Sequence, residues 1–174
     1  MSQIENNEVL QCIHDRRSIR RFQKKPVSAE QLTCLIQAAQ AAPSAMNEQP
    51  WYFVAIQKRE LIEQLGQLLA DSGEDPYYGA SLLIVGFGRR EAHSPITDVT
   101  LAMANMMLAA QSLGLGTCWI DYSRHVFNHP QFAGLQRSLG VPEGYFCVGS
   151  LIVGVPDEQP QAHTVRHQIV SVVG

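Results

Sequence analysis

The spacing of apolar residues changes along the chain between a helical period and the patterns typical of strands. Helical spacing, interrupted by capping and breaking residues, predicts helices over 6–15, 27–43, 58–70, 97–114 and 130–140. Aromatic, β-branched or continuous apolar runs predict strands over 51–57, 81–87, 116–121, 145–155 and 167–173. Helices and strands therefore mix within 174 residues, a length that suits one compact core, and we predict a single domain over residues 1–174.

Local signals mark the ends of two of these helices. Ser28 and Gln31 have the spacing of a capping box, and Pro43 stops the helix that they begin. The helix over 97–114 is the most apolar, and Gly114 suits the position that follows a helix. It is shorter than the roughly 20 clean apolar residues of a membrane span. We expect this helix to be buried nearly all round, in the core or at a subunit interface, and we expect no membrane partner.

Composition and charge narrow the function classes. The chain has 13 Lys and Arg against 16 Asp and Glu, a formal net charge of -3, which argues against a general electrostatic grip on nucleic acid. The first residues have no basic start followed by an apolar run, so we expect a cytoplasmic protein. Four cysteines are scattered without a C-x-x-C pair, which disfavours a structural zinc site and a redox motif of the thioredoxin type.

Several common catalytic motifs are incomplete or missing. After the strand over 81–87, "GFGRRE" has Glu91 where a dinucleotide-binding turn needs its third glycine, so a plain loop is favoured. His125 and His129 are four residues apart and on a helix would share a metal with Asp121, but an exposed helix start explains them more simply and we predict no metal site. The chain has no G-x-S-x-G motif, so the nucleophile turn of an α/β serine hydrolase is absent from the sequence.

The stretch "DRRSIRRF" over 15–22 places four arginines in an acidic chain. Arg16 and Arg17 follow a predicted helix, where cations favour the helix dipole. The alternative is a local anion site, because guanidinium forks match phosphate geometry.

A second informative stretch, "APSAMNEQPW" over 42–51, joins a predicted helix to a predicted strand. Pro43 and Pro50 restrict the backbone at its two ends, and Ser44, Asn47 and Gln49 supply side chains that donate and accept hydrogen bonds. Such a loop suits a planar ring with alternating donors and acceptors. Alternatively, its amides satisfy the neighbouring backbone after a helix end.

In order along the chain, "RRSIRRF", "APSAMNEQPWYF", "GLGTCWI" and a basic residue at Arg166 resemble the nitroreductase family of FMN-dependent oxidoreductases. The resemblance runs from about Arg16 to Arg166. It implies an α+β fold with a central, mostly antiparallel sheet flanked by helices in three α/β/α layers. It also implies an intertwined homodimer with FMN at the subunit interface, in which the strand over 167–173 pairs with the other subunit.

The same resemblance assigns site residues. Arg16 and Ser18 would bind the FMN phosphate, Arg17 the phosphate or ribityl chain, and Arg20 the N1/C2=O edge of the ring, while Arg21 faces solvent. A loop from the other subunit would lie over or beside the flavin, with Met46 lining the substrate channel; its flavin-binding residues are Pro43, Ser44, Ala45 and Asn47.

The third and fourth motifs complete the implied site. The backbone at Cys118, Trp119 and Ile120, with Asp121 as a further candidate, would pass one face and the N5 edge of the ring, although Trp119 also suits the core. Arg166 would be a phosphate ligand. Residues 71–80, expected to form an exposed loop, offer no Asn or Lys for ring contacts, so the substrate pocket is expected to be open.

The activity implied by the resemblance is hydride transfer from NADH or NADPH to flavin N5, followed by ping-pong reduction of nitroaromatics, quinones or similar small acceptors. An arginine near N1 stabilises the negative charge that collects there on reduction. Alternatives are an enzyme that degrades reduced flavin, a non-catalytic flavin-binding protein, and an α+β domain without flavin.

Overall fold

A four-stranded sheet forms the centre of the fold. The computed structural model describes residues 7–69, 74–162, 164 and 171–174. The strands lie in the order β1-β2-β4-β3, and every neighbouring pair is antiparallel. Their bounds are β1 Trp51–Ile56, β2 Leu82–Arg89, β3 Gly116–Ile120 and β4 Tyr145–Gly154.

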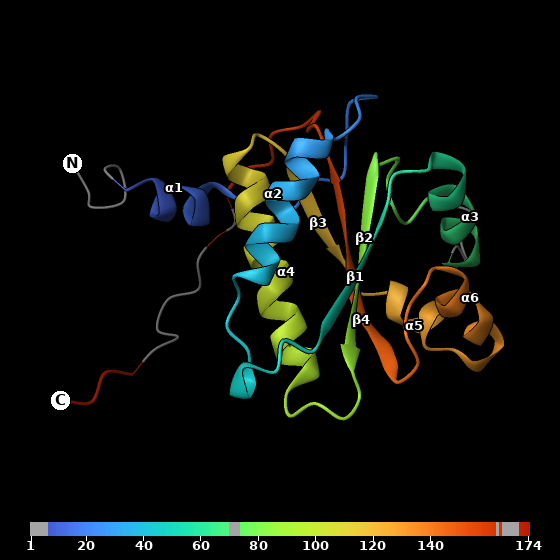
Figure 1. Ribbon diagram of the computed structural model, residues 1–174. Coiled ribbons are helices and arrows are strands. Elements are labelled where there is room, and N and C mark those ends of the chain that lie inside the picture. The colour runs from blue at the N-terminus through green and yellow to red at the C-terminus, as the bar shows by residue number, and fades with distance from the viewer. Residues whose placement is uncertain (1–6, 70–73, 163, 165–170) are drawn as a thin grey trace.

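Helices cover both faces of this sheet (Figure 1). One layer holds α2 and α4, and the opposite layer holds α3, α5 and α6, while α1 extends beside α4 and away from the sheet. The bounds are α1 Glu8–Asp15, α2 Ala29–Gln40, α3 Arg59–Leu69, α4 Pro95–Ser112, α5 Ser123–Phe127 and α6 Ala133–Ser138, with short 3₁₀ turns η1 Ala45–Asn47 and η2 Pro130–Phe132. The predicted α+β fold with three layers is confirmed. Among the described helices, none has both the length and the apolar content needed to cross a lipid bilayer.

Side chains on the two faces of β2 belong to two separate hydrophobic cores. Leu82 and Ile84 pack toward α2 and α4, whereas Leu83, Val85 and Phe87 belong to the cluster on the other face. This alternation follows from the period of two along a strand. The sheet therefore supports a hydrophobic core on each side.

The glycines of "GFGRRE" lie in β2, so the expected loop is wrong for them. A side chain at Gly86 would place its Cβ 2.5 Å from the sulfur of Met103 on α4. Gly88 is crowded in the same way by Pro95, whose Cβ would lie 3.0 Å away. These glycines leave room for α4 against the sheet, so their role is in packing.

Within the single chain, helix α4 is buried on one side only, so the predicted burial nearly all round, which included burial at a subunit interface, stays a prediction. Met103 and Met106 are buried against the sheet, whereas Ile96, Leu101 and Leu113 stay exposed by 59%, 42% and 37%. An apolar face of this helix therefore remains uncovered in the single chain. Helix α1 likewise exposes its apolar side chains, Val9, Leu10 and Ile13.

Other local predictions have mixed outcomes. The capping box of Ser28 and Gln31 is present, and Gly114 follows α4 with φ +70°. Helix α2 ends at Gln40, before Pro43. The expected exposed helix start is present, since the exposed His129 caps η2 and the exposed His125 lies near the start of the short helix α5.

One further local prediction is wrong in part, and another stays a prediction because its expected pairing is with a second subunit. The expected exposed loop over 71–80 is wrong at Tyr77 and Ala80, which are buried. Of the predicted strand over 167–173, residues 167–170 lie outside the described residues. The remainder, within 171–174, has no regular structure in the single chain.

Candidate functional site

The arginine segment lies along the beginning of β3. Ser18 forms a parallel bridge with Thr117, and the Ile19 N–H donates to the Thr117 carbonyl at 2.9 Å. Ile19 is buried, and a Cβ on Gly116 would lie 2.7 Å from its side chain. The two backbones approach this closely because Gly116 has no side chain. The arginine segment therefore lies alongside β3, at the edge of the four-stranded sheet.

The arginine side chains have different surroundings. Arg16 is half-buried just after α1, and Arg17 bends back so that its Nη1 donates to the carbonyls of His14 and Arg16, at 2.6 and 2.8 Å. The Nε of Arg17 is buried and has no hydrogen-bond partner among the described residues. Arg21 is 70% exposed, 3.9 Å from Asp157, in keeping with the expected solvated position.

Glu158 is a residue of this region that the sequence motifs did not indicate. Its Oε1 accepts the backbone N–H of Arg20 at 2.5 Å and that of Arg21 at 3.1 Å. One carboxylate oxygen therefore holds two consecutive peptide groups of the arginine segment. Glu158 stands in "PDEQPQ", which has no pattern that would reveal this distant contact.

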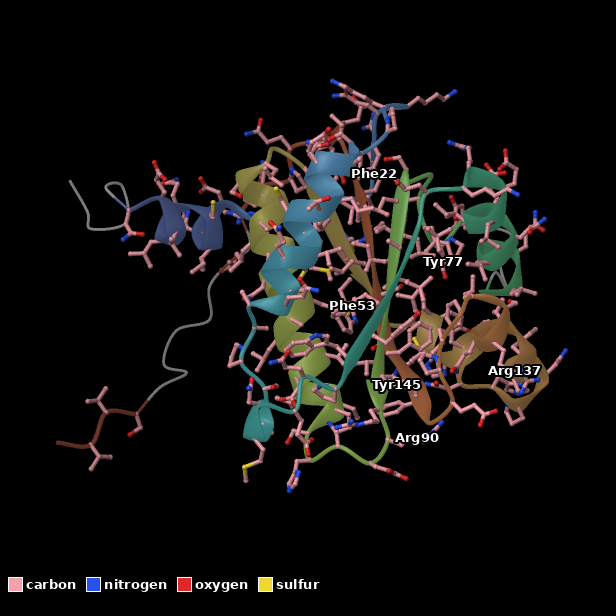
Figure 2. The ribbon with its side chains drawn as sticks, in the orientation of Figure 1. Phe22, Phe53, Tyr77, Arg90, Arg137 and Tyr145 are labelled. Atoms are coloured by element: carbon pink, nitrogen blue, oxygen red, sulfur yellow. The ribbon has the colours of Figure 1, made fainter. Side chains whose placement is uncertain are left out.

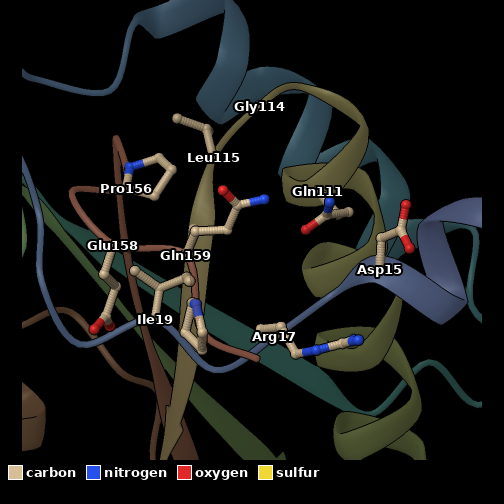
Figure 3. A pocket seen from close by; sticks show the side chains of 11 residues that line it. Asp15, Arg17, Ile19, Gln111, Gly114, Leu115, Pro156, Glu158 and Gln159 are labelled. Carbon is tan, nitrogen blue, oxygen red and sulfur yellow. The ribbon is translucent and has the colours of Figure 1, made fainter. Parts of the chain in front are cut away.

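A cleft of about 420 Å³ opens between the arginine segment, the end of α4 and the chain after β4 (Figure 3). Within the described chain it is lined by Asp15, Arg17, Ile19, Gln111, Gly114, Leu115, Gly116, Pro156, Glu158, Gln159 and Pro160. Arg16, Ser18 and Arg20 are not among these residues. The side chains of Gln11 and His14 hydrogen-bond Asp15 and lower the pKa of its carboxyl, which keeps the carboxyl ionised.

The loop between α2 and β1 has a strained backbone. Met46, Asn47 and Gln49 all have positive φ, at 52°, 55° and 45°. Residues other than glycine and asparagine rarely adopt this region, so the strain falls mainly on Met46 and Gln49, at about 1 to 3 kcal/mol each. Met46 is 80% exposed, so its own burial does not offset that cost.

Hydrogen bonds hold this loop in place. Ser44 Oγ accepts the backbone N–H of Gln49 at 3.0 Å, and the Gln49 amide donates to Asn47 Oδ1 at 2.9 Å. Oδ1 of Asp98, a buried residue in the first turn of α4, accepts the Ala45 N–H at 3.1 Å. The polar residues therefore satisfy one another and the local backbone, as one of the two interpretations of this loop expected.

A second tether joins the loop to the turn before α4. Both carboxylate oxygens of Glu48 contact His93, one accepting its backbone N–H at 2.9 Å and the other lying 3.1 Å from Nδ1. The backbone bond, with the ring contact, lowers the pKa of Glu48. No motif marks this pair, because the two residues are far apart in the sequence.

The arginine segment and this loop lie at opposite ends of α4. The loop is tied to Asp98, and the cleft beside Arg17 is lined by Gln111. Gln111 lies thirteen positions after Asp98 along the helix, a rise of about 20 Å at 1.5 Å per residue. The two motifs that sequence reasoning combined are therefore not brought together within one chain.

In β3, the side chains of Cys118 and Ile120 point into the core that includes α5. The Trp119 ring lies on the other face, half-buried against Gly149. The expected flavin contact through the backbone of this strand stays a prediction. Asp121 follows the strand, is exposed and pairs with Arg124 at 2.9 Å.

The remaining candidates have simple structural positions. His129 Nδ1 accepts the Gln131 N–H and begins η2, and the His125 ring lies 5.1 Å from that of Tyr122. Within residues 7–69, 74–162, 164 and 171–174, no three side chains of His, Cys, Asp or Glu gather as metal ligands. Arg166 lies outside the described residues.

Comparison with known proteins settles the family. The sequence model of the nitroreductase family matches residues 13–87 and 72–155. The chain belongs to the nitroreductase family. This membership confirms the resemblance that the arginine segment and the 42–51 stretch suggested.

Three similar proteins illustrate the family. A nitroreductase with bound FMN from Bacteroides fragilis superimposes with a TM-score of 0.89 at 28% identity, covering 97% of this chain and 100% of that one. Another with bound FMN, from Desulfitobacterium hafniense, has a TM-score of 0.86 at 27% identity, with coverages of 97% and 99%. An FMN reductase (NAD(P)H) from Bacillus subtilis is 29% identical over 176 residues, covering 88% of this chain and 68% of that one.

Proposed function

We propose that the chain is an FMN-dependent NAD(P)H oxidoreductase that reduces nitroaromatics, quinones or similar small acceptors. The observation that carries this proposal is the arginine segment on the edge of β3, beside a cleft, in a chain whose fold matches FMN-bound nitroreductases. The similar FMN reductase (NAD(P)H) supports the choice of donor.

The residues at the cleft fit the phosphate end of such a cofactor. Arg17 has a buried Nε without a partner among the described residues, and an anionic ligand would satisfy this donor. The volume of about 420 Å³ is in the range of small-molecule sites. Glu158 also faces the cleft, but two backbone N–H groups already stabilise the charge on its Oε1.

When bound, FMN would supply the hydride chemistry, so the protein needs neither a nucleophile nor a metal. In this proposal Arg16, Arg17 and Ser18 bind the phosphate and ribityl chain. The Arg20 guanidinium favours the reduced ring by facing the edge where negative charge collects. Glu158 holds the Arg20 backbone, which limits the directions in which that side chain extends.

We also propose that the working site needs a second copy of the chain. Within one chain the strained loop lies about 20 Å from the cleft, so a partner must bring its own loop to the arginine segment. The uncovered apolar faces of α1 and α4 offer surface for such a contact. In the homodimer, the flavin-facing residues would be the partner's Pro43, Ser44, Ala45 and Asn47, with the partner's Met46 in the substrate channel.

The test begins with the cofactor. The purified protein is expected to carry or take up one yellow FMN per chain, and NADH or NADPH is expected to bleach it under anaerobic conditions. A screen of nitroaromatics and quinones then identifies acceptors that restore the colour. A protein that binds no FMN refutes the proposal. FMN binding without reduction indicates a flavin carrier, and loss of the flavin itself in oxygen indicates the flavin-degrading activity.

Two further measurements test the assigned roles. Arg20→Ala is expected to weaken FMN binding or make the bound flavin harder to reduce, while Arg21→Ala, its exposed neighbour, is the matched control. Dilution to monomers is expected to release the flavin. Stoichiometric FMN in a monomeric sample contradicts the shared site.

A further inference from the structure

A row of buried hydroxyl groups connects the loop before β2 to the end of β3. The Tyr77 hydroxyl lies 3.1 Å from Ser123 Oγ, which lies 2.6 Å from Ser150 Oγ. Ser150 Oγ in turn donates to the Ile120 carbonyl at 3.2 Å. Tyr77, Ser123 and Ser150 are fully buried, so water does not compete for these bonds. The row links Tyr77, Ser123, Ser150 and the carbonyl of Ile120, which no sequence motif connects.

Proton counting gives this row a single direction. Each hydroxyl carries one proton, and Ser150 uses its proton on the Ile120 carbonyl. Ser123 must therefore donate to Ser150, which leaves Tyr77 as the donor to Ser123. Burial raises the pKa of Tyr77 far above its ordinary value, so its hydroxyl keeps its proton. Tyr77 thus stands at the head of the row and Ile120 at its end.

Tyr77 is held at the head by its own loop. Asp75 Oδ1 accepts the Tyr77 N–H at 2.9 Å, and Oδ2 accepts the Gly79 N–H at 2.7 Å. Between them, Tyr78 turns the chain with φ 54°. Figure 2 shows Tyr77 between the sheet and α3. The loop therefore directs this side chain into the core.

The far end of α5 has a separate anchor on β4. Asn128 Nδ2 donates to the Cys147 carbonyl and Asn128 Oδ1 accepts the Cys147 N–H, both at 2.8 Å. Ser123 and Asn128 therefore hold the two ends of this five-residue helix against the same strand. The turn between β3 and α5 is left with little freedom.

The last bond of the row orients a peptide group at the surface. In a trans peptide the C=O and the following N–H point in opposite directions. No described peptide is cis. Because the Ile120 carbonyl points inward to Ser150, the Asp121 N–H points away from that buried group. Asp121 is exposed, so this donor is presented where the chain leaves β3.

We propose that Tyr77 is a positioning residue which, through Ser123 and Ser150, fixes the Ile120–Asp121 peptide and aims its N–H at the bound flavin ring. The flavin part of this inference rests on the proposed function. Residues 71–80 offer no Asn or Lys for a contact with the ring. In this proposal the loop around Tyr77 acts on the ring indirectly, by fixing the Ile120–Asp121 peptide.

The test uses Tyr77→Phe, which removes one hydroxyl and keeps the buried ring. Tyr78→Phe is the matched control, because that neighbouring ring is 44% exposed and outside the row. Ser150→Ala and the double variant measure the coupling between the ends of the row. All four proteins are compared in the flavin-free and FMN-loaded forms, with the urea midpoint recorded for each.

In the flavin-free protein, the readout is the ¹⁵N order parameter of the Asp121 amide. We expect it to fall in Tyr77→Phe from about 0.85, typical of rigid backbone, toward 0.6. In the FMN-loaded protein, at saturating donor, we expect anaerobic flavin reduction to slow about fivefold, the factor carried by one neutral hydrogen bond, with the donor's half-saturating concentration unchanged. The double variant should be no slower than Ser150→Ala, because both changes break one row.

A lowered urea midpoint with wild-type values for both the Asp121 order parameter and the flavin reduction rate overturns the inference, since the hydroxyl then only stabilises the fold. Fully additive effects of Tyr77→Phe and Ser150→Ala overturn it as well. If the wild-type protein binds no FMN, the proposed function and the flavin part fail together. The order parameter still decides whether Tyr77 fixes the peptide.

Discussion

The contact between Gly149 and Trp119 gives a sharp test of how β3 and β4 fit together. A Cβ on Gly149 would lie 2.3 Å from Cζ2 of Trp119, and 2.9 Å from two further atoms of that ring. Ordinary contacts of this kind are near 3.5 to 4.0 Å. Gly149→Ala must therefore displace the Trp119 ring of β3 by about 1 Å or more.

The expected cost follows from overpacking. Adding a methyl group to a tightly packed site typically lowers the free energy of unfolding by about 1 to 3 kcal/mol. Urea unfolding followed by circular dichroism measures this change without relying on the displaced ring. Gly134→Ala is the control, because a Cβ there meets nothing within 4 Å and lies in helix α6. Alanine in place of that helical glycine should be neutral or stabilise by up to about 1 kcal/mol.

A compensating change separates the contact from other causes. Trp119→Leu in the Gly149→Ala background makes room beside the new methyl group and should restore part of the lost free energy. The reasoning is refuted if Gly149→Ala unfolds at the same urea concentration as the wild type. It is also refuted if Trp119→Leu destabilises the Gly149→Ala protein as much as it destabilises the wild type.

Three other predictions concern the loop and a helix end. Asp98→Ala should lower the free energy of unfolding by about 2 kcal/mol, because the Ala45 N–H loses its acceptor; an unchanged urea midpoint contradicts this. The contact with His93 lowers the pKa of Glu48 below 4.5. The ionised Glu48 carboxylate therefore contributes fully to the free energy of unfolding above about pH 4.5, and this contribution is lost as the pH falls through the lowered pKa. Glu48→Gln should flatten the stability profile in that acid range, and an unaltered slope speaks against the pair. Ser28→Ala should cost about 1 kcal/mol by removing the cap of α2, measured by thermal unfolding, and a neutral result excludes the capping role.

The sequence predicted those parts of the fold that depend on neighbours along the chain. The capping box of Ser28 and Gln31 and the turn at Gly114 appear as expected, because both involve residues within one helical turn. Four of the five predicted strands appear near their predicted ranges, since an apolar run that faces helices on both sides must lie in a buried sheet. The expectation of an exposed loop failed at Tyr77, where burial depends on distant partners.

For the candidate site, residue types in the right order indicated the family, and they predict an anion-binding role for the arginine segment. The sequence did not indicate Glu158, which holds Arg20 across 138 positions, or the tether from Asp98 to Ala45 across 53. Nor did it show that the arginine segment and the loop over 42–51 lie at opposite ends of α4. Local propensities and caps act over a few residues and can be read from order alone. Contacts between distant segments depend on how helices pack on the sheet, so only the tertiary structure decided them.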